Sequence, residues 1–423
     1  MISELKIRNF KSLESVDLKL GHFNLLVGAN ASGKSNFLDA LRVLQGIGNG
    51  LAIDEVLDGK PPSDSSARWP GIRGGSKFAT FRNRNGPQLD QFELHITLKA
   101  QEIVTQAGDD LTYHLACMTA GEKTCILSDS ISHGRSFVFP ENLRNDFFGG
   151  IPETFRPTLL RMSLFKLART IVEAARQPEV AREVEELKDP SLVKEGVELI
   201  SRLANFGSTY LSGIEFFDPL ASAARDYSAR VKRMSESGEG IASIIHEIET
   251  NGNKPALLEW LKELRPDEVD DIYALEGLNS DFMLAIKEGN EEFRAPILSE
   301  GTLRFIALAA AFFQPSMPKV LVIEEIEKGL HPSRLRLLLE LMRSQSKRTG
   351  TQVFATTHSP TLLNWLTEED RKTTFVCTRD AESGATKMRS LAEVPNLEGL
   401  IKKHYNLDQL FEEGWLESVL HES

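Results

Sequence analysis

The sequence predicts a mixed α/β fold, in which a glycine-rich loop on a mixed sheet is combined with an antiparallel β layer and a helical insertion. A glycine-rich loop follows an apolar strand near the N-terminus, and strands alternate with helices from Ser299 onward. A stretch rich in Ala, Glu, Leu, Lys and Arg separates the two parts. Strand–helix alternation is typical of a parallel sheet, and the helical periodicity between the two parts indicates an inserted block.

Composition is that of an ordinary globular protein. The chain has 423 residues, 41% hydrophobic and 26% charged, with a net charge of −12. The negative charge argues against constitutive coating of nucleic acid or anionic membrane. Cys117, Cys125 and Cys377 form no CxxC pair, which favours a reducing, cytoplasmic compartment. The apolar run 305–313 is shorter than the ~18 residues that a membrane span needs, so no membrane crossing is expected.

The N-terminal part is predicted to contain strands, the loop and a first helix. Apolar residues at i, i+4 and i+7 after the loop (Phe37, Leu41 and Leu44) predict that helix. Alternating segments between about residues 78 and 139 predict the antiparallel layer. The predicted strands are 4–10, 15–20, Phe23–Val27, Gln91–Leu98 and Leu111–Met118.

Residues Gly28–Ser35 fit the pattern GxxxxGK[ST] between an apolar strand and a helix. Such a loop directs backbone N–H groups and a helix N-terminus toward phosphate oxygens. Lys34 is expected to reach the β- and γ-phosphates, and the Ser35 hydroxyl to ligate Mg²⁺. A glycine-rich turn without a ligand is the alternative, which the strand–loop–helix context disfavours. The loop therefore predicts binding of a nucleoside triphosphate.

The middle of the chain has helical periodicity, for example over Phe165–Leu187 and Pro190–Phe206. We predict an N-terminal part over 1–150, a helical insertion over 151–292 and a C-terminal part over 293–423. The C-terminal part is predicted to alternate between helices and strands. Its predicted elements are helix Gly301–Phe313, strand Lys319–Glu324, helix Ser333–Ser346, strand Gln352–Thr357, helix Pro360–Leu366 and strand Thr373–Cys377.

Two carboxylates follow the apolar strand 320–323 directly. A buried strand that delivers acidic side chains at its carboxyl end suits a metal–phosphate site. We expect Glu324 to hold Mg²⁺ through its water shell and Glu325 to activate the attacking water. A solvated surface pair is the alternative. His358 ends the next predicted strand and could sense the γ-phosphate or the water, although a histidine in that place is commonly structural.

Four segments together resemble a known family: 28–36 (GANASGKSN), 298–308 (LSEGTLRFIAL), 320–332 (VLVIEEIEKGLHP) and 354–360 (FATTHSP). They resemble the ABC-type AAA ATPases of the RecF/SMC/OLD group. More narrowly, the chain is similar to compact bacterial members that lack long coiled-coil arms and are frequent in phage-defence loci. The opening segment Leu5–Ser12 is also typical of that group. No DxD follows the histidine strand, so no Toprim nuclease domain is expected.

The resemblance implies a site residue by residue. Ser299, Glu300 and Gly301 correspond to the signature motif, which contacts the γ-phosphate held by another protomer. Glu324 ends the Walker B strand, Glu325 is the catalytic glutamate, and His358 is the switch histidine. The resemblance also implies that the Walker A residues contact ATP and that Lys34 among them has a catalytic role. The Walker A residues are Gly28, Ala29, Asn30, Ala31, Ser32, Gly33, Lys34, Ser35 and Asn36.

The sequence departs from the family pattern in two places. Walker B usually ends in Asp, and Glu324 carries one methylene more, which a water-mediated metal contact can absorb. Hydrolysis is therefore expected to be slow rather than absent. The signature reads SEG rather than the SGG of transporters, which matches the non-transporter branch. For the glutamine loop, Gln45 and Gln88 are both candidates.

A signature motif that acts across an interface implies a homodimer, or a higher even-numbered oligomer, that sandwiches ATP. We expect an ATP-gated switch that controls a separately encoded effector in phage defence or DNA processing. This effector is expected to be a nuclease. The alternatives are a RecF-like repair ATPase that binds DNA directly and, less favoured, the nucleotide-binding subunit of a transporter. The segment Leu407–Leu420 mixes acidic and apolar residues, which suits either core packing or docking.

A basic segment with interspersed aromatic residues is the candidate nucleic-acid surface. A solvated loop, or an arginine that pairs with nucleotide, is an equally good interpretation. The basic residues of this segment are Arg68, Arg73, Lys77, Arg82 and Arg84.

Overall fold

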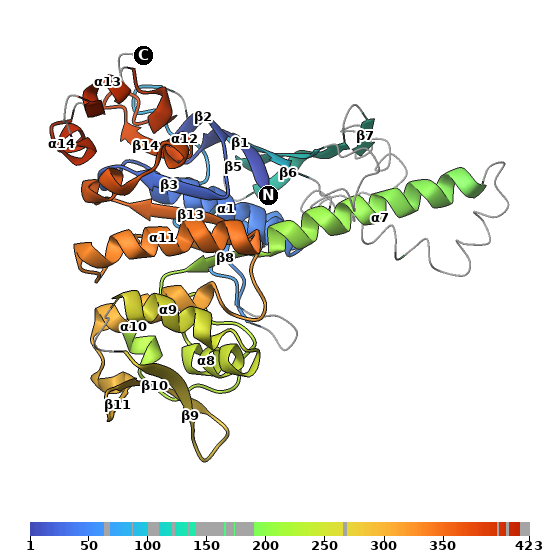
Figure 1. Ribbon diagram of the computed structural model, residues 1–423. Helices are drawn as coiled ribbons and strands as arrows, with labels where there is room; N and C mark the ends of the chain where they lie inside the picture. Colours follow the sequence, from blue (N-terminus) through green and yellow to red (C-terminus); the bar gives the residue numbers. More distant parts are fainter. Residues whose placement is uncertain are drawn as a thin grey trace. The chain divides into compact units, whose positions relative to one another are not determined.

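The computed structural model describes residues 1–62, 68–86, 88–99, 110–120, 123–133, 136–139, 165, 173, 190–264, 269–395, 397–402 and 406–414. The chain divides into two compact units. The first contains residues 1–21, 29–214 and 377–389, and the second contains residues 22–28, 215–376 and 390–423. Each unit is therefore assembled from segments that lie far apart in the sequence. Figure 1 labels the helices and strands.

The first unit contains a six-stranded antiparallel sheet with the strand order β2-β1-β4-β5-β6-β7. Burial alternates along β4, where Phe92, Leu94, Ile96 and Leu98 face the core. This period of two is the pattern of a sheet with one buried face. It confirms the predicted antiparallel layer. The strands are β1 (Ile2–Phe10), β2 (Leu13–Lys19), β4 (Gln91–Leu98), β5 (Leu111–Ala120), β6 (Lys123–His133) and β7 (Ser136–Phe139).

Helices α1 (Lys34–Gly48), α2 (Ile53–Asp58) and α7 (Pro190–Ser212) belong to the same unit. At Gly48 a Cβ atom would lie 2.5 Å from the backbone nitrogen of Ser212, so glycine permits the close approach of α1 and α7. The predicted helix over Pro190–Phe206 is confirmed by α7. Of the predicted helix Phe165–Leu187, only residues 165 and 173 are described.

A second six-stranded sheet has the order β15-β14-β3-β13-β12-β8. Strand β3 is parallel to β13, and β13 is parallel to β12. The carboxyl ends of these three strands therefore lie at one edge of the sheet. The strands are β3 (Phe23–Val27), β8 (Ile214–Phe217), β12 (Val320–Ile323), β13 (Gln352–Thr357), β14 (Thr374–Arg379) and β15 (Thr386–Ser390).

Most of the helices after β8 belong to the second unit, where α11 packs against β3 and β13 and α8 packs against β9 and β10. Helix α10 is almost entirely buried, because nearly all of its residues after the first turn are apolar. The helices of this unit are α8 (Ile241–Thr250), α9 (Lys254–Leu264), α10 (Glu300–Ala311), α11 (Pro332–Thr349), α12 (Glu368–Lys372), α13 (Leu397–Lys402) and α14 (Leu407–Glu412). The 3₁₀ turns along the whole described chain are η1 (Ser76–Phe78), η2 (Ala221–Ala224), η3 (Ala295–Ile297), η4 (Pro360–Trp365) and η5 (Leu391–Glu393). The predicted alternation after Ser299 and the mixed α/β fold are confirmed.

The block 151–292, predicted as a helical insertion, also contains strands. Strand β8 lies within it, and β9 (Asp271–Glu276), β10 (Phe282–Glu288) and β11 (Glu291–Arg294) form an antiparallel sheet. Ser280, in the turn between β9 and β10, has φ 57, a left-handed conformation that occurs in tight turns. The division at 150 and 292 stays a prediction.

The segment after His358 is a 3₁₀ turn rather than the predicted α-helix Pro360–Leu366. It closes through i→i+3 contacts, from the nitrogen of Leu362 to the carbonyl of Ser359 and from Leu366 to Leu363. The segment begins with Pro360 and is six residues long, and 3₁₀ turns are frequent as short connectors between longer elements.

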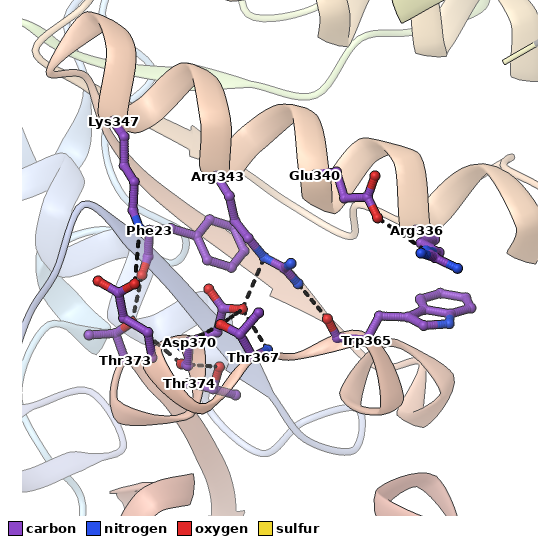
Figure 2. A network of polar contacts seen from close by, with 11 residues as sticks. Phe23, Arg336, Glu340, Arg343, Lys347, Trp365, Thr367, Asp370, Thr373 and Thr374 are labelled. Carbon is purple, nitrogen blue, oxygen red and sulfur yellow. Dashed lines mark hydrogen bonds and ion pairs between the residues drawn. The ribbon is translucent and has the colours of Figure 1, made fainter. Parts of the chain in front are cut away.

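A polar network joins α11 to the segment that precedes β14 (Figure 2). Arg343 on α11 pairs with Asp370 at 3.0 Å and donates to the carbonyl of Trp365 at 2.6 Å. The Asp370 carboxylate also accepts from the backbone nitrogen of Thr367 at 2.7 Å, which caps α12. The pair is largely buried, with 18% of the Arg343 side chain and 9% of the Asp370 side chain exposed.

Replacing Arg343 by alanine should lower the free energy of unfolding by about 2–3 kcal/mol, because it leaves a mostly buried carboxylate without its cation. The matched control is Arg336→Ala on the same helix, whose ion pair with Glu340 is exposed and contributes about 0.5 kcal/mol or less. Urea unfolding of both variants measures the difference. Equal destabilisation by the two substitutions would contradict a stabilising role for the buried pair.

Candidate functional site

The phosphate loop has a strained backbone, in which Gly33 and Ala31 both have positive φ angles. Helix α1 begins at Lys34, and Gly33 precedes it at φ 105. A Cβ atom on Gly33 would collide with the side chain of Thr386, so both conformation and space require glycine there. Ala31 also lies in the left-handed region, at φ 64, where glycine would be easier. The loop is held in one shape rather than being a loose turn.

A chain of hydrogen bonds supports the loop within the first unit. The Asn36 amide donates to Ser12 Oγ at 2.6 Å, and Ser12 Oγ lies 2.6 Å from Thr386 Oγ1. Thr386 Oγ1 in turn donates to the carbonyl of Ser32 at 2.9 Å. Asn36, which is predicted to contact ATP, therefore also helps to hold the loop through its hydrogen bond to Ser12. Sequence reasoning missed Ser12 and Thr386, although Ser12 ends the family-like opening segment.

The cationic side chains beside the loop are tied down. Lys34 is buried and its ammonium donates to the carbonyl of Ala29 at 2.8 Å. Arg73 donates to the carbonyl of Ser35 at 3.0 Å and pairs with the buried carboxylate of Asp39 at 3.3 Å. Ser35 itself is exposed at the start of α1. The loop thus presents Ser35 to solvent while its lysine is folded onto its own backbone.

The carboxylates lie in the second unit, where strand β12 ends. Residues 320–323 are fully buried, Glu324 is half-buried and Glu325 is exposed. Glu325 has φ 48, a conformation that is rare for a side chain of this size. Its backbone nitrogen donates to Thr356 Oγ1 on β13 at 3.0 Å. The sheet thus holds Glu325 in a turn that directs the chain away from the strand.

His358 lies at the end of β13 and is paired with Glu327. The Glu327 carboxylate lies 2.8 Å from His358 Nδ1 and also accepts from the backbone nitrogen of His358 at 2.7 Å. Glu327 is nearly buried, whereas the His358 side chain is about half exposed. The contact orients the imidazole and connects the ends of β12 and β13.

The signature segment begins α10 in the same unit. Ser299 Oγ caps the helix by accepting from the nitrogen of Thr302 at 3.1 Å, and Ser299 and Glu300 are exposed. A Cβ atom on Gly301 would lie 2.6 Å from the carbonyl of Gly329. The signature glycine therefore allows α10 to pack closely against the segment that follows Glu325.

Sequence reasoning missed Arg304, which lies one turn into α10. It is 4% exposed, and its guanidinium reaches the carbonyls of Glu324 and Glu325. The sequence does carry a signal for it, because it is the cation in the otherwise apolar run 303–313.

The second unit thus brings together Glu324, Glu325, His358 and the signature segment, and the phosphate loop leaves β3 at Gly28 on the same sheet edge. Ala29–Asn36 belong to the first unit. Among the described residues, no three His, Cys, Asp or Glu side chains gather in a metal cluster. The predicted Mg²⁺ ligands, the Ser35 hydroxyl and the Glu324 carboxylate, are oxygen donors that suit an ion which keeps several waters.

Of the glutamine-loop candidates, Gln45 donates through its amide to the carbonyl of Ile214, and Gln88 is exposed. Neither observation identifies which of the two residues forms the glutamine loop. No helix in the described part of the chain is long and apolar enough to cross a membrane.

The basic segment is only partly accessible to a ligand. Arg73 is engaged by Asp39, and Arg84 donates to the carbonyl of Ala381 at 2.9 Å. Arg82 and Lys77 both lie over the exposed ring of Phe78, at 4.6 Å and 5.7 Å from its centre. Arg68 is exposed.

Comparison with known proteins decides the family. The profile described as "AAA domain, putative AbiEii toxin, Type IV TA system" matches residues 23–364, more than half of the chain. The chain belongs to this family. It is an ABC-type AAA ATPase of the RecF/SMC group, as its motifs predicted.

Relatives of this AAA ATPase support the same assignment. Over 100 residues it is 31% identical to an "ATP/GTP phosphatase" of Helicobacter pylori (strain ATCC 700392 / 26695), covering 23% of this chain and 27% of that protein. Over 41 residues it is 51% identical to the "DNA replication and repair protein RecF" of Glaesserella parasuis serovar 5 (strain SH0165), covering 10% and 11%. The chain thus matches about a quarter or less of the length of these relatives.

The fold of this AAA ATPase is similar to that of an SMC head. The solved structure is titled "Crystal structure of the SmcHead bound to the C-winged helix domain of ScpA". The similarity covers 95% of this chain and 99% of that chain, with a TM-score of 0.51 and 14% sequence identity. This likeness confirms the ABC-ATPase head fold.

Proposed function

We propose that this AAA ATPase is a cytoplasmic ATP-gated switch that closes as a dimer around ATP and controls a separately encoded nuclease in phage defence or DNA processing. The observation that carries the proposal is the exposed Glu325, which follows a buried parallel strand in a turn held by Thr356 of β13 and by Arg304 of the signature helix. A carboxylate in this place can activate water against a phosphoryl group.

In the proposed site, each residue has one role. The loop Gly28–Asn36 binds the phosphates through its backbone N–H groups, and Lys34 exchanges its contact with Ala29 for one with the β- and γ-phosphates. Ser35 and Glu324 hold Mg²⁺, which when bound neutralises charge on the phosphates. Glu325 takes the proton of the attacking water. His358, oriented by Glu327, contacts the γ-phosphate or the water.

The exposure of the signature segment supports a contact with a second protomer. Ser299 and Glu300 are exposed at the start of a long helix, where backbone N–H groups can receive an anion. Ile297, just before them, is 69% exposed. ATP that contacts both protomers would stabilise the closed dimer, and hydrolysis would remove those contacts.

The effector is tested by capture on the Glu325→Gln protein, with ATP in one arm and no nucleotide in the other. An ATP-dependent partner that cuts nucleic acid only when combined with this protein supports the proposal. Capture of no partner in either arm from the source cells would contradict it. The description of the family names a putative toxin, and growth arrest when this chain is expressed alone would favour that activity instead of effector control.

Nucleic-acid binding is a second candidate function, favoured by the two cations over the exposed Phe78 ring. The combined substitution Lys77→Gln and Arg82→Gln should weaken DNA binding and flatten its salt dependence by roughly one unit of log–log slope for each phosphate that is no longer neutralised. The control is Lys347→Gln, which removes an exposed charge that is paired with Glu369. Fluorescence anisotropy at several salt concentrations measures both. An unchanged slope would reject this surface.

A further inference from the structure

Arg304 is a charged residue at a position where an apolar side chain would be expected. It lies on α10 between Leu303 and Phe305, all of them buried, and Arg304 itself is 4% exposed. Burying a guanidinium is costly unless its donors are satisfied and its charge is balanced. The partners of Arg304 therefore indicate why an arginine stands there.

One side of the guanidinium is anchored to the loop that follows β8. Nη1 donates to the Asp218 carboxylate at 2.7 Å and to the carbonyl of Pro219 at 2.8 Å. Asp218 also accepts from Lys328 at 3.0 Å. Burial raises the pKa of Asp218, but its hydrogen bonds with Arg304 and Lys328, together with the positive charges of both side chains, outweigh that effect and lower the pKa. Asp218 therefore stays ionised and fixes the orientation of the guanidinium.

The other side of the guanidinium holds the turn that carries the carboxylates. Nη2 lies 3.3 Å from the carbonyl of Glu324 and 3.2 Å from the carbonyl of Glu325. Both carbonyls lie beyond Ile323, the last residue of β12. A lysine could supply the charge, but it lacks the planar fork that contacts Asp218 and both carbonyls at once.

The backbone of Glu325 needs such support because its φ of 48 is unfavourable for a side chain with a Cβ atom. Thr356 also holds this turn. Its Oγ1 accepts from the nitrogen of Glu325 at 3.0 Å, and its carbonyl accepts from the nitrogen of Ile326 at 3.1 Å. Strained backbone persists where its surroundings over-determine it, and here Arg304 and Thr356 do so together.

We propose that Arg304 is a positioning residue for Glu325, and that it connects the signature end of α10 to the water-activating carboxylate. This inference rests on the role of Glu325 in the proposed function. Ser299 and Arg304 lie on the same helix, so a shift of α10 on contact with nucleotide is transmitted by the guanidinium to the two carbonyls that set the direction of the Glu325 side chain.

Arg304→Lys is the main test. It should lower kcat for ATP hydrolysis by about 10- to 100-fold, because displacing the catalytic carboxylate by about 1 Å slows the reaction by that factor. KM should stay within about two-fold of its original value. Thr356→Val should lower kcat similarly, and Thr356→Ser should restore it by returning the acceptor oxygen. Arg230→Lys is the control, since that arginine forms an exposed pair with Glu247. Circular dichroism and urea unfolding establish that each variant is folded.

A double substitution separates positioning from a merely structural role. In a Glu325→Gln background, Arg304→Lys should leave the residual single-turnover rate unchanged, because the residue through which it acts is already removed. An equal loss in both backgrounds would overturn the inference. A folded Arg304→Lys protein with wild-type kcat would overturn it too. If Glu325→Gln itself keeps full activity, the proposed function fails instead, so the two failures are distinguishable.

Discussion

Glu325→Gln should reduce steady-state ATP hydrolysis by about 10²–10⁴-fold while ATP binding is retained, because the amide cannot accept the proton of the attacking water. The substitution keeps the size of the side chain and leaves the backbone contacts of Glu325 with Thr356 and Arg304 in place. ATP that is bound but not hydrolysed should then hold two protomers together. Phosphate release measures the rate, and sedimentation with and without ATP measures the assembly.

Glu340→Gln is the control for this experiment, because Glu340 lies on α11 in an ion pair with Arg336 and has no predicted role. It should behave as the unsubstituted protein in both measurements. Glu325→Gln protein that remains monomeric at saturating ATP would refute the sandwich arrangement. Full hydrolysis by the same variant would refute the assignment of Glu325.

Lys34→Ala should weaken ATP binding by about 100-fold or more, since each hydrogen bond to a charged group contributes about 1.5–3 kcal/mol. The lysine is buried against its own loop and its ammonium donates to the carbonyl of Ala29, a contact that phosphate oxygens would replace. Titration with a fluorescent ATP analogue measures the affinity. Lys19→Ala, an exposed lysine on β2, is the control and should bind normally.

Mixing the Lys34→Ala protein with a Ser299→Arg protein tests whether the two motifs act across an interface. Each variant alone should be inactive. In a mixed dimer, Lys34 of one copy and Ser299 of the other form one intact site. Random pairing of equal amounts should therefore restore about a quarter of the normal rate. An inactive mixture of two folded, dimerising variants would place both motifs in one protomer.

The sequence predicted much of the fold where short-range patterns are strong. The strands Gln91–Leu98 and Gln352–Thr357 were predicted at their observed bounds. The first has a period of two and the second is rich in β-branched and aromatic residues, and either pattern is visible without tertiary information. The hairpin of β9 and β10 was missed, because its strands become strands by packing against α8 and each other rather than by a strong local preference.

The same contrast holds in the candidate site. Lys34, Ser299, Glu325 and His358 were predicted because their chemistry is written in contiguous motifs. Arg304 and Thr386 were missed because their importance lies in what they contact. Arg304 reaches carbonyls 20 and 21 residues away, and Thr386 reaches the phosphate loop across 354 residues. Backbone atoms are the acceptors in each case, and no residue type in a sequence marks a carbonyl that will need a donor.

The sequence by itself therefore determined which chemical groups this ATPase can use: a phosphate loop, paired carboxylates after a buried strand, and a capped signature helix. Only the tertiary structure decided how they are held. It placed Glu325 in a left-handed turn between Thr356 and Arg304, fixed His358 against Glu327, and filled the space beside Gly33 with Thr386. The physical reason is that motif chemistry depends on residue type and spacing, whereas orientation depends on hydrogen bonds between segments that meet only when the chain is folded.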